Sequence, residues 1–279
     1  MILLADSGST KTTWALCHQG QVVATHITVG LNPFHQSVND ISDTVADLPE
    51  AMRHANRVRF YGAGCTQEKK ECVASALRTV FAYANIGVES DMLGAAHALL
   101  QHERGIACIL GTGANSCLYD GTQIVQNVPP LGYILGDEGS GAVIGKRFVG
   151  DCLKNQTPAA LKQLFLDTYA TSAADIVEHV YRQPQANRYL AQFAPFLSAN
   201  IDRYDYIRTL VSDCFRDFFV RNVLQYDGAH TLPIAFVGSV AYHFAAPLRT
   251  TAQALGLHIS KIEQSPIAGL AEFYIDSEE

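Results

Sequence analysis

The sequence predicts an α/β protein built from two related lobes, each of which opens on a small β-meander. At 279 residues the chain exceeds the usual size of one domain. The chain opens with an apolar strand, a glycine-containing turn, a strand, a tight glycine turn and a third strand, and this order begins again near Gly105. The repetition indicates a duplicated lobe. Alternating strands and helices in the second half favour a largely parallel interior there.

The expected elements follow the hydrophobic pattern along the chain. Strands of the first lobe are expected at residues 2–5, 12–17, 22–27, 58–61 and 86–89, and helices at 37–48 and 66–83, the latter capped by Thr66. Strands of the second lobe are expected at residues 106–110, 115–119, 124–127, 232–237 and 259–262, and helices over most of 157–226, at 239–255 and after Pro266. The expected lobes are 1–104 and 105–279, with the last helix, about 266–279, a candidate to pack back on the first lobe.

Composition excludes several classes of protein. The net charge is −7, and the longest basic cluster, Lys69-Lys70, is followed at once by Glu71, so we expect no nucleic-acid partner. No apolar stretch approaches the roughly 20 residues that a membrane span needs, and the apolar start ends at Asp6, too early for a signal peptide. The seven cysteines show no metal-ligand spacing and are typical of free thiols. A cytoplasmic globular protein is expected.

Two glycine-containing turns occupy corresponding places in the two lobes. In the first, Gly8 lets backbone amides approach a phosphate, Lys11 adds a positive charge, and Asp6 stands where a carboxylate can hold hydrated Mg²⁺. This is not a P-loop, because Lys11 leads into a strand. Each turn alone is an ordinary hairpin, but one nucleotide held between two lobes needs a contact from each. The candidate nucleotide-binding residues in these turns are Asp6, Gly8, Ser9, Thr10, Lys11, Thr12, Gly111, Thr112 and Gly113.

Two further glycine segments follow in the second half. Gly238 and Ser239 join a strand to a helix, where a flat group such as adenine can lie against the backbone. Residues 131–141 place four glycines around Asp137 and Glu138. Because such a loop is costly to order, it is more typical of a site than of a spacer. Its acidic pair is expected to bind sugar hydroxyls, or else to cap the following helix.

Together these segments resemble the actin-like ATPase (ribonuclease H-like) and sugar-kinase superfamily, and within it the N-acetylglucosamine kinase and BadF/BadG-type ATPase group. The resemblance covers nearly the whole chain. It implies a two-lobed fold with a mixed β-sheet flanked by helices in each lobe, and ATP with Mg²⁺ as cofactors, the metal being held by Asp6 through water.

The resemblance also implies the remaining site residues. Asp91, at the end of a predicted strand, matches the position of the catalytic aspartate that accepts the proton of the acceptor hydroxyl. The residues expected to hold the sugar are Asn32, Asn115, Gly132 and Asp137. The implied activity is ATP-dependent phosphorylation of the 6-hydroxyl of an amino sugar, with N-acetylglucosamine the first choice. A homodimer is the assembly that similar kinases suggest.

Two alternatives remain open on the sequence alone. A BadF-type ATPase would activate a partner dehydratase through an iron–sulfur cluster, for which Cys65 is the tempting residue, although the cysteine spacing gives no convincing ligand set. A non-enzymatic sugar-sensing regulator would carry a DNA-binding domain ahead of the first strand, and that strand is expected at residue 2. The choice among amino sugars depends on the cavity around one substituent, which the sequence does not reveal.

Overall fold

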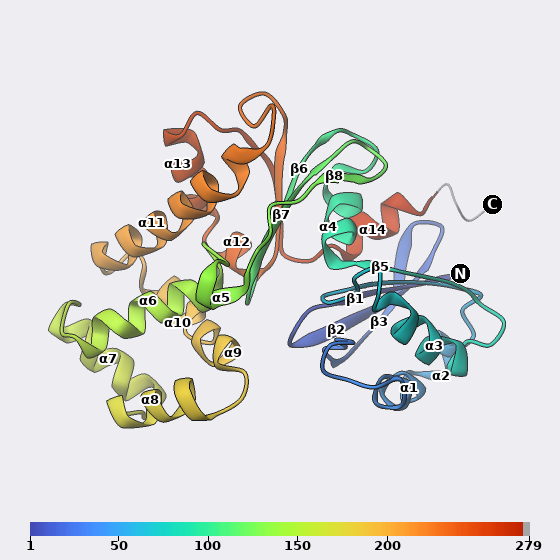
Figure 1. Cartoon of the computed structure of the whole chain (residues 1–279), viewed down its shortest axis with the longest axis horizontal. Helices are drawn as coiled ribbons and strands as arrows, with labels where there is room; N and C mark the ends of the chain where they lie inside the picture. Colours follow the sequence, from blue (N-terminus) through green and yellow to red (C-terminus); the bar gives the residue numbers. More distant parts are fainter. Residues whose placement is uncertain (276–279) are drawn as a thin grey trace. The chain divides into compact units, whose positions relative to one another are not determined.

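The structure is a computed structural model that describes residues 1–275. The chain divides into two compact units: unit 1 holds residues 1–107, 119–125 and those described from 265 on, and unit 2 holds residues 108–118 and 126–264. Within residues 1–275 the strands form two five-stranded sheets (Figure 1). The segment from residue 265 thus belongs with the start of the chain.

The first sheet has the order β3-β2-β1-β4-β5. Its strands are β1 (Ile2–Ser7), β2 (Lys11–His18), β3 (Gln21–Val29), β4 (Arg57–Gly62) and β5 (Asn85–Ser90). The first three form an antiparallel meander, whereas β4 and β5 run parallel to β1. The register aligns Asp6 with Tyr61, and Tyr61 with Glu89. The carboxyl ends of the three parallel strands therefore meet at one edge of the sheet.

Helices cover both faces of this sheet. They are α1 (Val38–Ala46), α2 (Glu50–Arg53), α3 (Lys70–Val80), α4 (Asp91–Leu100) and α14 (Ile267–Phe273). Residues of α1 and α3 pack with Leu3 and Trp14 in one core, whereas α4 and α14 pack with Ile2 and Leu4 in another. Figure 1 shows α14, near the red end of the chain, beside α4. Because side chains alternate along β1, Asp6 lies on the face of Leu4, which α4 covers.

The predicted helix at 66–83 begins later than expected. The N–H groups of Lys69 and Lys70 both donate to the carbonyl of Thr66 at 2.9 Å, which closes a separate turn, and α3 starts at Lys70 without a side-chain cap. Thr66 is therefore not the cap. Gly64, with φ +81°, reverses the chain just before this turn and sets its direction.

The second sheet repeats the order of the first. Its strands are β6 (Gly105–Leu110), β7 (Ala114–Tyr119), β8 (Ile124–Gln126), β9 (Ile234–Val237) and β10 (Ile259–Glu263). Read from β8, the order β8-β7-β6-β9-β10 places a three-strand meander at one side and two later strands beyond its first strand, as in β3-β2-β1-β4-β5. The repeated lobe that the sequence suggests is therefore present as a repeated topology.

The remaining helices lie between β8 and β10. They are α5 (Gly132–Leu135), α6 (Gly141–Leu153), α7 (Ala159–Tyr169), α8 (Ala173–Arg182), α9 (Ala186–Ala191), α10 (Ala194–Asn200), α11 (Asp205–Arg221), the 3₁₀ turn η1 (Val223–Gln225), α12 (Ser239–His243) and α13 (Ala245–Ala254). Phe165 of α7 meets Phe148 and Phe193 edge to face, each at 5.0 Å between ring centres. Such pairs stabilise a core beyond their buried area.

The single helix predicted for 239–255 is wrong, because the chain breaks between α12 and α13 at Phe244. In a continuous helix the N–H of residue 247 would bond to the carbonyl of His243. That residue is Pro247, which has no N–H and whose ring would collide with this carbonyl. The carbonyl of His243 instead accepts the Ser198 hydroxyl at 3.4 Å.

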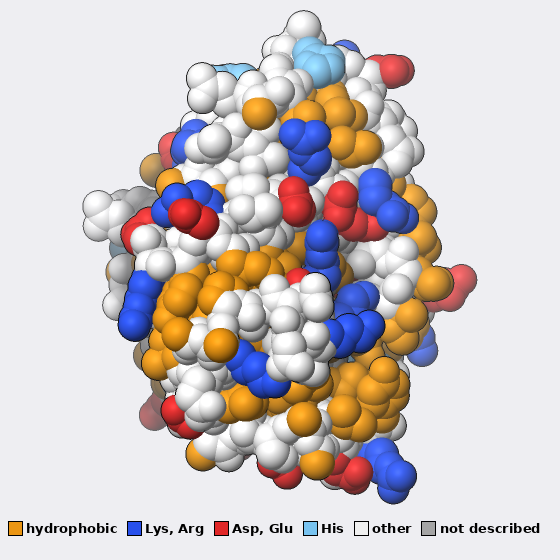
Figure 2. Space-filling view, turned by 90° about the vertical axis from the view of Figure 1, so that its left-hand side faces the viewer, with side chains coloured by type: hydrophobic (Ala, Val, Ile, Leu, Met, Phe, Trp, Pro, Cys, Tyr) orange, Lys and Arg blue, Asp and Glu red, His pale blue; other side chains and the backbone are white. Residues whose placement is uncertain are grey.

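Within the described part of the chain, no helix has both the length and the apolar character needed to cross a membrane. On the face drawn in Figure 2, lysine and arginine side chains are interspersed with acidic, apolar and neutral polar ones.

Candidate active site

The first glycine turn, between β1 and β2, is held by buried hydroxyl groups. The Gly8 N–H donates to the Lys11 carbonyl at 3.0 Å. The Ser7 hydroxyl, fully buried, lies 2.8 Å from the Thr12 hydroxyl, donates to the Leu31 carbonyl at 3.0 Å and accepts the Leu31 N–H at 2.9 Å. These bonds fix the turn against the segment that follows β3.

Thr12 therefore differs from its neighbours in the turn. Its buried hydroxyl donates to the Val29 carbonyl at 3.0 Å, so it holds the turn in place. Gly30 lies directly beneath, where an added Cβ would overlap the carbonyl oxygen of Gly8. The exposed part of the turn comprises Gly8, Thr10 and Lys11, with Ser9 partly exposed. These four residues remain the candidates for phosphate contact.

Two carboxyl groups meet beside this turn. The pKa of Asp6 is raised to about 7, chiefly by burial and next by the charge of Asp91, while Lys11 opposes the rise. Burial likewise raises the pKa of Asp91 to about 6, against the lowering effect of the Met92 N–H, which donates to Asp91 at 2.9 Å. Ser90 caps α4 by accepting the Leu93 N–H at 3.2 Å, so Asp91 is not needed as the cap. Two carboxylates with raised pKa values at one strand edge are typical of a catalytic or metal site.

The raised pKa of Asp6 makes the stability of the protein depend on pH. In the folded state its proton is held up to about pH 7, whereas the unfolded value is 3.8. The free energy of unfolding therefore falls as pH rises between these values. We expect Asp6→Asn to raise the thermal midpoint over wild type at pH 8, in EDTA without nucleotide, and this gain to shrink towards pH 4. Asp43→Asn, at an exposed position of α1, is the control; an equal gain for Asp6→Asn at both pH values would contradict the assignment.

Asn32 is fixed in one orientation by its own turn. Its Oδ1 accepts the Phe34 N–H at 2.9 Å, so its Nδ2 group is left to face a ligand. A side chain at Gly64 would collide with this Oδ1. The Asn32 turn therefore lies against residues 62–65, at the end of β4. The sequence analysis did not predict that residues 62–65 support the Asn32 turn. Gly62-Ala63-Gly64, at the end of a strand, nevertheless resembles the other glycine turns of the candidate site.

The second glycine turn, between β6 and β7, forms one piece with the acidic loop. The N–H of Gly141 donates to the Gly111 carbonyl at 2.8 Å, and that of Ala142 to the Thr112 carbonyl at 3.1 Å. The Ala114 N–H donates to Asp137 Oδ1 at 3.3 Å. The first turn of α6 and the Asp137 carboxylate thus pack on the predicted phosphate turn.

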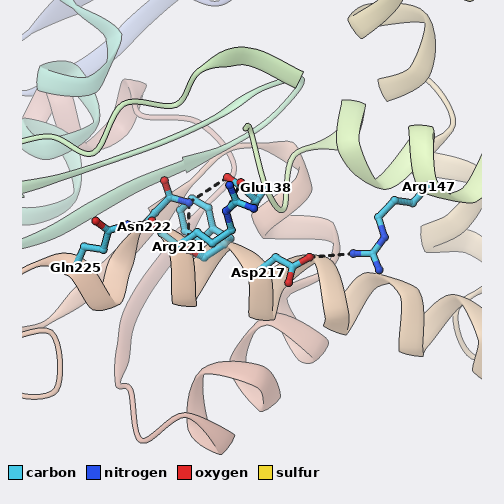
Figure 3. Close-up of polar contacts among 7 residues, drawn as sticks. Glu138, Arg147, Asp217, Arg221, Asn222 and Gln225 are labelled. Carbon is cyan, nitrogen blue, oxygen red and sulfur yellow. Dashed lines mark hydrogen bonds and ion pairs between the residues drawn. The ribbon is translucent and has the colours of Figure 1, made fainter. Parts of the chain in front are cut away.

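The acidic pair divides into two roles. Asp137 has φ +54°, and burial raises the pKa of its carboxyl, an effect that the charge of Glu138 reinforces. Glu138 turns away to α11: its Oε1 lies 2.7 Å from Arg221 Nε, and its Oε2 accepts Asn222 Nδ2 at 3.3 Å (Figure 3). Glu138 therefore anchors the loop, and Asp137 is the carboxylate of the pair that lies at the turn.

The space beside each of the two turns, taken separately, suits a phosphate group. At Gly111 an added Cβ would meet no atom within 4 Å, and at Gly8 only the Lys11 carbonyl oxygen at 3.9 Å. A side chain would therefore fit at either position without collision. The backbone at each glycine borders open space, through which a ligand can approach it. Asp6, a buried carboxyl whose pKa is raised, fits a divalent cation that would stabilise its ionised form.

The third glycine turn joins the second within unit 2. Gly238 has φ +123°, and an added Cβ would overlap the carbonyl oxygen of Leu110, the residue before Gly111. A pocket of about 450 Å³ opens beside both turns. Its lining comprises Gly111, Thr112, Ala191, Gln192, Ala194, Pro195, Ser198, Ala199, Ser239, Val240, His243 and Phe244. This mostly apolar lining and volume suit a nucleobase with its ribose.

The pocket wall from α9 and α10 was not predicted. Residues 191–199 carry no glycine motif, and their apolar side chains resemble those of any core helix.

The predicted site residues fall into two groups. Unit 1 brings together Asp6, Gly8, Ser9, Thr10, Lys11, Asn32 and Asp91. Unit 2 brings together Gly111, Thr112, Gly113, Asn115, Asp137, Gly238 and Ser239. Gly132, exposed at the start of α5, has no packing contact at its Cβ position.

Cys65, the residue of the activator alternative, is buried beside Gly62. Burial raises the pKa of its thiol to about 12, and the charge of Asp91 contributes. Over residues 1–275, no cluster of three or more histidine, cysteine, aspartate or glutamate side chains is placed to hold a metal ion.

Comparison with known proteins gives matches among solved structures. No protein-family profile and no curated protein matches the chain. A proposed N-acetylglucosamine kinase from Porphyromonas gingivalis is 45% identical over 100% of both chains, with a TM-score of 0.97. A proposed N-acetylglucosamine kinase from Chromobacterium violaceum has a TM-score of 0.74 at 17% identity over 98% of both chains. A proposed N-acetylmannosamine kinase from Listeria monocytogenes has a TM-score of 0.53 at 12% identity, over 100% of this chain and 99% of that one.

The last two similarities concern the fold alone, and they confirm the two-lobed α/β architecture. The similarity to the Porphyromonas gingivalis protein covers both sequence and structure over the whole chain. It therefore includes the repeated sheets and the glycine turns at their edges. The chain therefore belongs to the N-acetylglucosamine kinase family of the actin-like ATPase (sugar kinase) superfamily.

Proposed function

We propose that the protein transfers the γ-phosphoryl group of ATP to the 6-hydroxyl of an amino sugar, with N-acetylglucosamine as the preferred acceptor. The observation that carries this proposal is the pair Asp6 and Asp91 at one strand edge, beside the first glycine turn. The choice of acceptor rests on the name given to the Porphyromonas gingivalis relative.

Asp91 is the proposed general base. A sugar hydroxyl is a poor nucleophile, and a carboxylate within hydrogen-bond reach can orient it and accept its proton as the phosphoryl group is transferred. The pKa of Asp91, about 6, leaves this carboxylate ionised at neutral pH while bringing its basicity closer to the working pH. Its position at the start of α4, held by the Ser90 cap, supplies a rigid support.

Asp6 is the proposed holder of Mg²⁺, through water. When bound, the ion would neutralise charge on the phosphate oxygens. Lys11 and the exposed backbone of the first turn would contact the same phosphates. Thr12 is assigned to holding this turn, because its hydroxyl bonds to Val29.

Unit 2 supplies the remaining proposed contacts. The 450 Å³ pocket, lined in part by Ser239 and by residues of α9 and α10, would take the adenosine, and Gly238 would hold the turn beside it. Gly111, Thr112 and Gly113 would contact phosphates, and Asn115 and Asp137 would contact the sugar. The fixed Asn32 amide in unit 1 would offer the sugar a hydrogen-bond donor.

We further propose a cytoplasmic homodimer. The support for the location is that none of the seven cysteines forms a disulfide among residues 1–275, which suits a reducing compartment. The support for the dimer is the resemblance to similar kinases.

The function is tested by ATP consumption with a panel of amino and neutral sugars. We expect N-acetylglucosamine to stimulate turnover most, and NMR to show phosphate at its 6-position. The 6-deoxy analogue is the matched control, because it lacks only the acceptor oxygen and should give no stimulation. Turnover that no sugar stimulates, or that the 6-deoxy sugar stimulates equally, would contradict the proposal.

A further inference from the structure

Asn127 follows β8 and reaches across to the neighbouring strand β7. Its Nδ2 group donates to Asn115 Oδ1 at 2.9 Å and to the Ser116 carbonyl. Asn127 itself is exposed, and the sequence analysis does not single it out. Its contact with Asn115, a proposed sugar ligand, suggests that it acts on the sugar through that residue.

The contact decides which end of the Asn115 amide faces outward. Oδ1 of Asn115 accepts two hydrogen bonds, from Asn127 and from the Ser116 N–H at 2.9 Å. Turning this amide over would place its NH₂ group against two donors and lose both bonds. Asn115 is therefore held with its Nδ2 donor available to a ligand.

A buried tyrosine holds the backbone on both sides of this contact. The Tyr226 hydroxyl donates to the Ser116 carbonyl at 2.8 Å and accepts the Val128 N–H at 3.0 Å. Tyr226 is only 2% exposed. The strand carrying Asn115 and the segment carrying Asn127 are thus tied together within unit 2, so the amide contact does not depend on a mobile loop.

We propose that Asn127 is a positioning residue for sugar recognition, which fixes Asn115 as a hydrogen-bond donor. This rests on the proposed function, because it takes Asn115 as a sugar contact. The ligand atom at this point must then be an acceptor, such as a hydroxyl oxygen or the carbonyl oxygen of an acylamino group.

The substitution Asn127→Asp tests this assignment. It replaces the donor facing Asn115 Oδ1 by a carboxylate of the same shape, which favours the reversed Asn115 amide. We expect the sugar Kd, measured by calorimetry, and the sugar KM to rise roughly tenfold. The KM for ATP and kcat should stay within about twofold, because Asn127 does not contact the nucleotide turns. Asn155→Asp, an exposed position of unit 2 outside the site, is the matched control and should change neither.

A double-mutant cycle separates positioning from a general loss of structure. In an Asn115→Ala background, Asn127→Asp should raise the sugar Kd no further, because no amide remains to be oriented. An unchanged sugar Kd in the single variant, or a full additional effect in the Asn115→Ala background, would overturn the proposal. The proposed function is judged separately, by the wild-type protein in the sugar panel.

Discussion

Replacing Asp91 by asparagine is expected to lower kcat by roughly 10²- to 10⁴-fold, the usual contribution of a general base. Asparagine keeps the shape of the side chain, and its carbonyl oxygen can still accept the Met92 N–H that Asp91 accepts at 2.9 Å. The Ser90 cap of α4 is also retained. The loss should therefore be confined to the step in which a proton leaves the acceptor hydroxyl.

The measurement is kcat with saturating sugar and ATP, together with the nucleotide Kd from titration. We expect the nucleotide Kd to change by less than about threefold, because the proposed nucleotide contacts are made by other residues. Asp43→Asn, on α1, provides the same chemical change at an exposed position and should leave kcat unaltered. Turnover near the wild-type value in Asp91→Asn would remove Asp91 from the mechanism.

The second large effect is expected for Gly238→Ala. A φ of +123° is strained for any residue with a Cβ, at a cost of about 1–3 kcal/mol, and this Cβ would also overlap the Leu110 carbonyl oxygen. Leu110 precedes Gly111, so relief of the overlap displaces the third and the second glycine turns together. We expect the KM for ATP to rise roughly 10- to 100-fold, since small displacements in a site have such effects.

Gly256→Ala separates backbone strain from the nucleotide site. Gly256 also has a positive φ, +69°, but an added Cβ would meet only the His230 Nδ1 atom, at 3.7 Å. Gly256 lies between α13 and β10, and its Cβ position does not contact Leu110 or the second glycine turn. This variant should lose some thermal stability and keep its KM for ATP. If both variants lost stability alike and neither changed the KM for ATP, the role given to Gly238 would be wrong.

The sequence was a good guide to the sheets because its strands are short apolar runs bounded by glycine. Ile2–Ser7 and Gly105–Leu110 were both found within a few residues of the predicted bounds. The recurrence of the meander predicted the repeated topology without any contact information. Helix ends were less certain, since they depend on local bonds. The break near Phe244 could have been predicted from Pro247, whereas the late start of α3 depends on a turn closed by the Thr66 carbonyl.

The candidate site was predictable where one short segment carries it. Glycine turns and strand-end carboxylates such as Asp91 can be recognised from a short stretch of sequence. The pocket wall from α9 and α10 could not be identified in this way, because its position is set by packing against residues about 45 to 50 positions away, such as Gly145 and His243. The burial of the Thr12 hydroxyl was foreseeable in part: Thr12 pairs with Ser7, so the two share one face of the hairpin. The orientation of the Asn115 amide depends on Asn127, which only the folded arrangement identifies.

The return of α14 to unit 1 has a consequence for the order of events during synthesis. Leu270 and Ile267 complete the core that Ile2 and Leu4 begin, and Gly269 lies so close to Ala98 that a Cβ there would overlap its carbonyl oxygen. Unit 2 ends at residue 264, so the ribosome has delivered all of unit 2 before it delivers this helix. Residues 1–107 therefore remain with one face of their sheet incompletely covered while some 160 further residues are translated. At about 5–20 residues per second this interval lasts roughly 10–30 seconds, during which a nascent-chain chaperone has its best opportunity to bind.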